Sequence, residues 1–143
     1  MKIIVGLGNP GKQYERNRHN TGFMALNTLL GNVKWQDSQK FKGLIYESGE
    51  IIYLKPQTFM NNSGEAVRSI MSFYGLLPKS FGLIKKADAD LTEVLTVIQD
   101  DIDIDLGKWK ISNDSRSGGH RGIQSIITNL KTQKFLRTGQ MLY

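Results

Sequence analysis

The sequence has 143 residues, about the size of one compact domain, so we expect residues 1–143 to form a single domain with its own core. It contains no cysteine, which excludes disulfide bonds and thiolate metal sites, and no apolar run approaches the roughly 18 residues that a membrane-spanning helix needs. The formal charge of +6 favours a polyanionic partner, and the absence of cysteine favours a cytoplasmic protein.

The first half of the chain mixes predicted strands with a helix. Lys2–Gly6 is a short β-rich apolar run that ends in a loop, and a helical pattern begins at Asn20 and stops at Gly31. Two further β-type runs, Gly43–Ser48 and Ile51–Lys55, flank a Gly-Glu pair. They predict an antiparallel hairpin.

The second half continues this mixture. Asn62 and Glu65 have the spacing of a capping box and precede an apolar helical face. Val94–Ile98 is an apolar strand pattern, Lys108–Ser112 alternates, and residues 123–130 carry apolar side chains at helical spacing. This order predicts an α/β domain with a mixed β-sheet covered by helices, whose ligands gather beyond the carboxyl ends of the strands.

Glycines follow the first predicted strand at Gly6, Gly8 and Gly11, which formally matches the fingerprint of nucleotide-binding oxidoreductases. In those enzymes the helix begins within the glycine turn, whereas here the polar run 12–18 separates the glycines from the helical pattern. The next strand also lacks an acidic residue at the distance that ribose binding needs. An oxidoreductase is therefore a distant alternative.

Alternating aspartates at Asp101, Asp103 and Asp105 are similar to the start of a calcium-binding loop. Such a loop needs glycine at its sixth position, where Leu106 stands, and a bidentate glutamate at its twelfth, where Ser112 stands. The sequence also contains no nucleophile elbow, phosphate loop or zinc-protease motif. We therefore expect no metal and no cofactor.

Four polar segments together form a more specific pattern. They are GLGNPGKQYERNRHNTG at 6–22, TFMNNSG at 58–64, DDIDIDLG at 100–107 and SGGHRG at 117–122. In this order they resemble the signatures of the bacterial peptidyl-tRNA hydrolase family, and the resemblance extends to Arg137. It implies an enzyme that hydrolyses the ester bond between a peptide and tRNA, and so recycles stalled peptidyl-tRNA in translation.

The resemblance also implies roles for individual residues. His19 matches the catalytic base, Asp100 the carboxylate that orients and stabilises this histidine, and Asn9 the residue that senses whether the amino group is blocked. Positions that contact the tRNA acceptor end or the peptide, or lie beside the ester, are matched by Tyr14, Phe59, Met60, Asn61 and His120. The family further implies peptidyl-tRNA as the partner and a monomeric enzyme without metal or cofactor.

These side chains are chemically suited to ester hydrolysis. A neutral imidazole, which titrates near ~6.5, takes a proton from water, and a carboxylate on its other nitrogen fixes the tautomer. Amides such as Asn9 and Asn61 hydrogen-bond peptide and ester oxygens, and aromatic rings such as Tyr14 and Phe59 stack on bases. No metal is required for this chemistry.

Basic residues gather around these loops and toward the end of the sequence. We interpret them as a track for the tRNA backbone. They are Arg16, Arg18, Lys108, Lys110, Arg116, Arg121, Lys131, Lys134 and Arg137.

Two features depart from the family pattern. Arg121 stands where the family has an asparagine, and a guanidinium differs from an amide in reach and geometry. Residues 138–143 diverge, so we expect the chain to lack a sheet strand and the C-terminal helices of the family, with an exposed strand edge as the result. Two alternatives stay open: a non-catalytic RNA-binding relative and an inactive truncated remnant.

Overall fold

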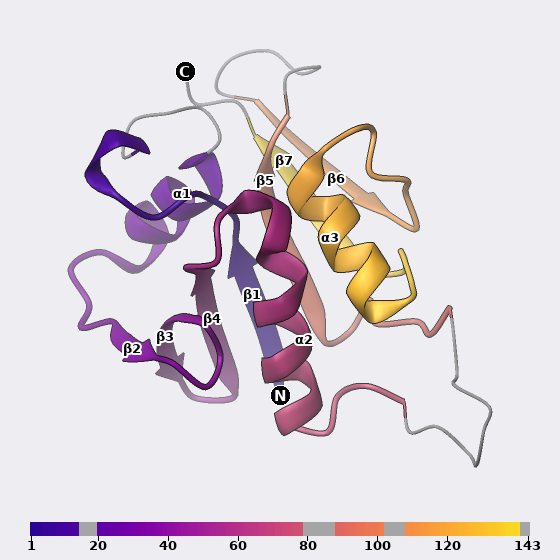
Figure 1. Ribbon diagram of the computed structural model, residues 1–143, viewed down its shortest axis with the longest axis horizontal. Helices are drawn as coiled ribbons and strands as arrows, with labels where there is room; N and C mark the ends of the chain where they lie inside the picture. Colours follow the sequence, from indigo (N-terminus) through magenta and orange to yellow (C-terminus); the bar gives the residue numbers. More distant parts are fainter. Residues whose placement is uncertain (15–19, 79–87, 102–107, 141–143) are drawn as a thin grey trace.

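One mixed sheet runs through the molecule, and three α-helices cover its faces (Figure 1). The computed structural model describes residues 1–14, 20–78, 88–101 and 108–140, and all counts here refer to them. The strands are β1 (Lys2–Gly6), β2 (Gln36–Ser38), β3 (Gly43–Ser48), β4 (Ile51–Pro56), β5 (Leu95–Asp100), β6 (Trp109–Asn113) and β7 (Leu136–Gln140). The helices are α1 (Thr21–Leu30), α2 (Ser63–Phe73) and α3 (Arg121–Leu130), with short 3₁₀ turns at Lys12–Tyr14 and Met60–Asn62.

The sheet has the strand order β2-β3-β4-β1-β5-β7-β6. Its centre is parallel, because β1 pairs in parallel with β4 and β5, and β5 pairs in parallel with β7. The outer pairings, β2 with β3, β3 with β4 and β6 with β7, are antiparallel. The carboxyl ends of β4, β1, β5 and β7 therefore meet at one edge of the sheet, where a ligand site is expected.

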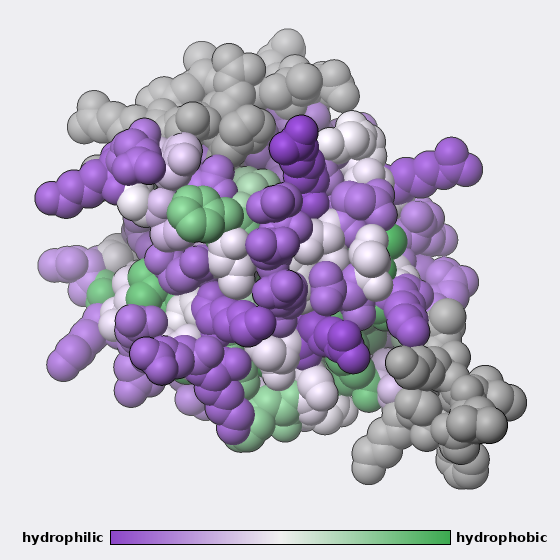
Figure 2. All heavy atoms as spheres, in the orientation of Figure 1, coloured by the Kyte–Doolittle hydropathy of each residue, from purple (hydrophilic) through white to green (hydrophobic). Residues whose placement is uncertain are grey.

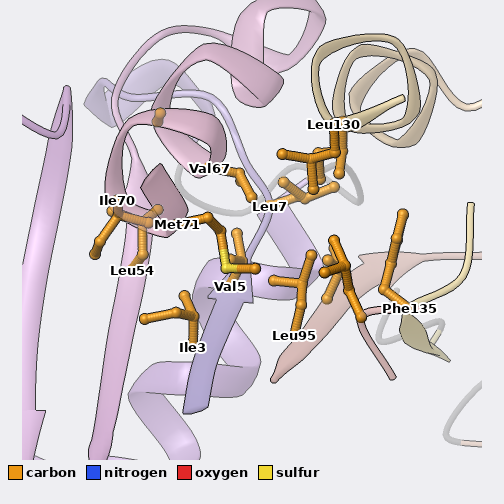
Figure 3. Close-up of a cluster of buried hydrophobic side chains, with 14 of the residues drawn as sticks. Ile3, Val5, Leu7, Leu54, Val67, Ile70, Met71, Leu95, Leu130 and Phe135 are labelled. Atoms are coloured by element: carbon orange, nitrogen blue, oxygen red, sulfur yellow. The ribbon is translucent and has the colours of Figure 1, made fainter. Parts of the chain in front are cut away.

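Side chains of β1 alternate between the two faces of the sheet. Ile3 and Val5 are fully buried on the face covered by α2 and α3, where they meet Leu54, Val67 and other apolar side chains (Figure 3). Ile4 belongs to a second apolar cluster on the opposite face, with residues of α1. The central strand is thus buried on both sides, which makes the parallel part of the sheet the rigid base for the loops that follow it.

Helix α1 lies very close to the end of β1 because Gly22 has no side chain. A Cβ atom at Gly22 would lie 2.2 Å from the backbone nitrogen of Leu7 and 2.5 Å from the carbonyl oxygen of Ile98. This contact holds the start of α1 against the carboxyl ends of β1 and β5.

The outer surface of α2 and α3 is polar. Figure 2, drawn in the orientation of Figure 1, shows a largely hydrophilic face with separate hydrophobic areas. In α2 the buried residues Ala66, Val67 and Ile70 alternate at helical spacing with exposed Glu65 and Arg68. In the part of the chain that the structure covers, no helix is both long and apolar enough to cross a membrane.

The mixed sheet covered by helices that the sequence predicts is confirmed, and so are the hairpin and all three predicted helices. The capping box is wrong in detail. Asn62 occupies the N-cap position of α2 without a side-chain capping hydrogen bond, and Glu65 instead accepts from Lys42 at 3.2 Å. Helix α2 is therefore stabilised mainly by its packing.

The structure corrects the expectation of an exposed strand edge after Phe135. β7 is hydrogen-bonded to β5 on one side and to β6 on the other, so residues 136–140 lie inside the sheet. Among the described strands, the edges of the sheet are β2 and β6.

Candidate active site

A cavity of about 550 Å³ opens at the carboxyl edge of the sheet. It lies between the loop after β1, the loop after β4 and the start of α3. Its lining residues are Asn9, Phe59, Met60, Asn61, Gly119, His120 and Arg121. Six of the nine residues predicted for the site thus lie on one cavity.

His120, which lines this cavity, forms a hydrogen-bonded pair with Asp100. Asp100 ends β5 and is 4% exposed, and its Oδ1 lies 2.8 Å from Nε2 of His120, whose side chain is 12% exposed. The other ring nitrogen of His120, Nδ1, accepts a hydrogen bond from the backbone N–H of Ile123 at 3.2 Å. Since Nδ1 is an acceptor, the proton lies on Nε2, which donates to the carboxylate.

His120 is therefore a structural partner of Asp100 as well as the N-cap of α3. Both of its ring nitrogens are engaged, so neither is available to take a proton from water without breaking a hydrogen bond. This excludes the simplest assignment of His120 as a base. His19, the residue that the sequence proposes for that task, lies outside the described residues, as do Arg16 and Arg18.

Asn9 is held in a defined orientation. The side chain of Asn20, 3% exposed, accepts from the backbone N–H of Asn9 at 2.7 Å and donates to its carbonyl oxygen at 3.0 Å. The side-chain Oδ1 of Asn9 accepts from the backbone N–H of Met60 at 2.6 Å. With Oδ1 so occupied, the group that Asn9 can offer to a ligand in the cavity is its Nδ2 donor.

Phe59 forms an exposed aromatic wall of the cavity. Its side chain is half exposed and its ring meets that of Tyr14 edge-to-face, with 6.4 Å between the ring centroids. The backbone of Phe59 has φ 64° and ψ 156°, a conformation that favours glycine. The structure therefore brings together Tyr14 and Phe59, the two aromatic residues that the sequence predicts to contact the acceptor end.

A second cavity, of about 370 Å³, adjoins the first and shares Gly119 and His120 with it. Three cations line it: Lys110, Arg116 and Arg137. Arg137 is 6% exposed, and its guanidinium donates to the carbonyl oxygens of Ser115 at 2.9 Å and Arg116 at 2.7 Å. It thereby ties β7 to the loop that leads to His120.

Sequence reasoning placed Arg137 only among surface cations, because its burial depends on β7, which has no apolar pattern. It also gave no role to Lys55. The available signal was a lysine in the otherwise apolar run Ile51–Pro56. Among the described residues, no group of three or more His, Cys, Asp or Glu side chains is arranged to hold a metal ion.

Comparison with known proteins identifies the family. Residues 3–139 match the family model described as peptidyl-tRNA hydrolase. The chain is 42% identical over 142 residues to the peptidyl-tRNA hydrolase of Mycoplasma capricolum. This alignment covers 96% of this chain and 69% of the relative. The chain is 43% identical over 144 residues to that of Bacillus thuringiensis, with the same coverage.

Solved structures of peptidyl-tRNA hydrolases have the same fold as this chain. A crystal structure of peptidyl-tRNA hydrolase from Acinetobacter baumannii superimposes with a TM-score of 0.79 at 28% identity, covering all of this chain and 69% of that one. A peptidyl-tRNA hydrolase in complex with N-propanol gives a TM-score of 0.78 at 29% identity, covering 97% of this chain and 66% of that one. These similarities in sequence and fold show that the chain belongs to the peptidyl-tRNA hydrolase family of enzymes.

Proposed function

We propose that this chain hydrolyses the ester bond that joins the peptide to tRNA in peptidyl-tRNA, with His19 as the general base. The observation that carries the proposal is the buried carboxylate of Asp100, which is held at 2.8 Å by His120 on the wall of a cavity that Asn9 also lines. A preorganised carboxylate beside a cavity is what a histidine base requires as its orienting group.

In the proposed reaction, His19 takes a proton from a water molecule as the water oxygen bonds to the ester carbonyl carbon. The carbonyl oxygen carries the negative charge of the resulting tetrahedral intermediate. When the intermediate collapses, the bond from carbon to the ribose oxygen breaks, and the imidazolium returns its proton to that oxygen. The products are a peptide with a free carboxylate and a tRNA with a free hydroxyl.

Asp100 acts on the base and not on the substrate in this proposal. Its negative charge stabilises the imidazolium of His19 as it forms and holds the ring in one tautomer. His120 keeps the carboxylate in place, because its Nε2–H donates to Oδ1 of Asp100. His120 is therefore a positioning residue.

Asn9, Asn61 and the aromatic wall bind the substrate. The Nδ2 group of Asn9 suits the carbonyl oxygen of a peptide bond, a group that an N-blocked substrate has and a free aminoacyl-tRNA lacks. The rings of Tyr14 and Phe59 are placed for stacking on terminal bases, a contact worth about 1 to 3 kcal/mol per base. Met60 and Arg121 complete the wall, and the cation of Arg121 suits a phosphate oxygen or the carboxylate product.

We further propose that the enzyme acts as a monomer in the cytoplasm, without metal or cofactor. All residues assigned to the site belong to one chain, and a histidine with a carboxylate partner suffices for this hydrolysis. Sedimentation of the purified chain tests the oligomeric state.

The test is release of labelled N-acetyl-aminoacyl product from N-acetyl-aminoacyl-tRNA, with unblocked aminoacyl-tRNA and the His19→Ala variant in parallel. We expect hydrolysis of the blocked substrate only, and a loss of about 10² to 10⁴ in rate in the variant. A folded chain that binds tRNA without hydrolysis would support the RNA-binding alternative, and an unfolded chain would support the inactive remnant.

A further inference from the structure

Lys55 is a buried cation that the proposed reaction does not use. It lies on β4, is 7% exposed, and faces α1. Its Nζ donates to the side-chain oxygen of Asn27 and lies 4.2 Å from the centroid of the Trp35 ring and 5.9 Å from that of Phe23. An ammonium has three donors, so among the described residues this one neutral acceptor and the aromatic faces leave part of its hydrogen-bonding capacity unused.

A cavity of about 320 Å³ gives access to Lys55. Its described lining contains two cations, Lys12 and Lys55, and no aspartate or glutamate. Desolvation by burial lowers the pKa of Lys55 to about 8. An anion in this cavity would supply the charge that the described neighbours of Lys55 lack.

The cavity also has a defined place relative to the candidate active site. Asn9 lines both this cavity and the one that contains His120. Asn20 and Gln57 add amide groups, although the Asn20 amide is already bonded to the backbone of Asn9. The Lys55 cavity therefore adjoins the candidate active site at Asn9.

We propose that the Lys55 cavity binds a phosphate group, supplied in the reaction by the acceptor strand of the substrate tRNA. The substrate carries a phosphate at every nucleotide, so one lies close to any ester on the terminal ribose. The assignment to the substrate rests on the proposed function, whereas the phosphate site itself does not.

Inorganic phosphate is the probe for the site. In a Trp109→Phe background, Trp35 is the only tryptophan, and its fluorescence reports events at Lys55. We expect phosphate to change that fluorescence saturably and to raise the pKa of Lys55, followed by NMR of lysine labelled with ¹³C at Cε, from about 8 toward its ordinary value. Acetate at equal concentration is expected to change neither. A Lys55 pKa that phosphate leaves unmoved would overturn the proposal.

Two kinds of variant test the role of the charge. Lys55→Met keeps the apolar stem and removes the ammonium, and should weaken phosphate binding about tenfold or more. Asn27→Asp places a carboxylate against Lys55 and should weaken phosphate binding similarly. Thr28→Asp adds the same charge at the next, exposed position of α1 and should retain most of the affinity. Equal losses in Asn27→Asp and Thr28→Asp would mean a nonspecific charge effect and would contradict the site.

Hydrolysis assays test whether the phosphate that binds at Lys55 belongs to the substrate tRNA, separately from whether the cavity binds phosphate at all. Lys55→Met should raise KM for N-acetyl-aminoacyl-tRNA with little change in kcat, and phosphate should compete with substrate in the wild type only. Normal KM in a variant that no longer binds phosphate would overturn the assignment to tRNA. If the chain shows no hydrolysis at all, the proposed function fails, but the phosphate titration still decides the site.

Discussion

At the scale of single residues, Phe59 combines an unfavourable backbone with an exposed ring. A non-glycine residue at φ 64° and ψ 156° costs about 1 to 3 kcal/mol and persists only when its surroundings enforce it. The neighbouring bonds do so, because the carbonyl oxygen of Phe59 accepts from Asn62 and the next backbone N–H donates to Asn9. The strain is thus offset by contacts that also hold Asn9.

Comparison of Phe59→Gly with Phe59→Ala separates the effect of the strained backbone from the effect of the aromatic ring. Both variants lack the aromatic wall, so both should bind tRNA more weakly by about 1 to 3 kcal/mol. Only glycine relieves the backbone, so Phe59→Gly should exceed Phe59→Ala in free energy of unfolding by about 1 kcal/mol, measured by urea denaturation. An alanine variant more stable than the glycine variant would show that the backbone is unstrained.

Lys55 should make stability depend on pH. Its pKa is lowered to about 8 in the fold and is near 10.5 in the unfolded chain, so between these values the unfolded chain binds more protons. The free energy of unfolding should therefore rise with pH across this window. Lys55→Met should remove that rise and add at most about 3 kcal/mol at pH 7. The exposed control Lys42→Met should keep the rise, and an unchanged profile in Lys55→Met would contradict the burial cost.

The sequence predicts Asp100 and His120 as site residues but not the pairing of their side chains. Asp100 and His120 are 20 positions apart, and nothing in either motif indicates that their side chains meet. Their contact depends on the packing of α3 beside the end of β5. The predicted contact between Asp100 and His19 stays a prediction.

At the scale of elements, helices α2 and α3 meet at a close contact behind the cavity. A Cβ atom on Gly64 would lie 2.1 Å from the carbonyl oxygen of Ser125, and the backbone N–H of Gly64 donates to Oγ of Ser125 at 2.9 Å. The N-terminal ends of these helices carry Asn61 and His120. Their separation therefore sets the width of the cavity.

Gly64→Ala should force the helices apart and lower the free energy of unfolding by about 1 to 3 kcal/mol. Ser125→Ala removes only the hydrogen bond and should cost about 1 kcal/mol. Urea denaturation measures both, and hydrolysis should lose more kcat/KM in Gly64→Ala than in Ser125→Ala. A Gly64→Ala variant as stable as the wild type would show that the contact yields without cost.

The elements that sequence patterns found are those with an amphipathic or continuous apolar pattern. The two strands missed are β2, with the sequence Gln-Asp-Ser, and β7, with Leu-Arg-Thr-Gly-Gln. Neither has an apolar run, because β2 is an exposed edge strand and β7 is held by its pairing with β5 and β6. Such strands are determined by tertiary partners, which local periodicity does not record.

At the scale of the whole molecule, the net charge of +6 is partly gathered beside the site. Lys110 and Arg116 line the cavity that adjoins the Asp100–His120 pair. Both residues are exposed on β6 and on the loop that follows it. A polyanion bound along these cations would therefore have one end directed toward the candidate active site.

Reversal of both charges, Lys110→Glu with Arg116→Glu, should weaken tRNA binding and flatten its dependence on salt. Each lost phosphate contact lowers the slope of log affinity against log salt by about 0.7 to 0.9. Binding isotherms between low and physiological salt measure this slope. Lys2→Glu with Lys34→Glu, the same change in net charge away from the site, is the control; equal slopes in both double variants would sink the proposed track.

In the proposed mechanism Asp100, positioned by His120, supports catalysis by a different histidine, His19. Hydrolysis of N-acetyl-aminoacyl-tRNA by His19→Ala, Asp100→Asn and His120→Asn tests it most directly, since asparagine at 120 can still cap α3. We predict losses of about 10² to 10⁴ in kcat for His19→Ala and Asp100→Asn, and of about tenfold or less for His120→Asn. A His120→Asn variant that loses as much as the others, or a His19→Ala variant with full activity, would contradict the account.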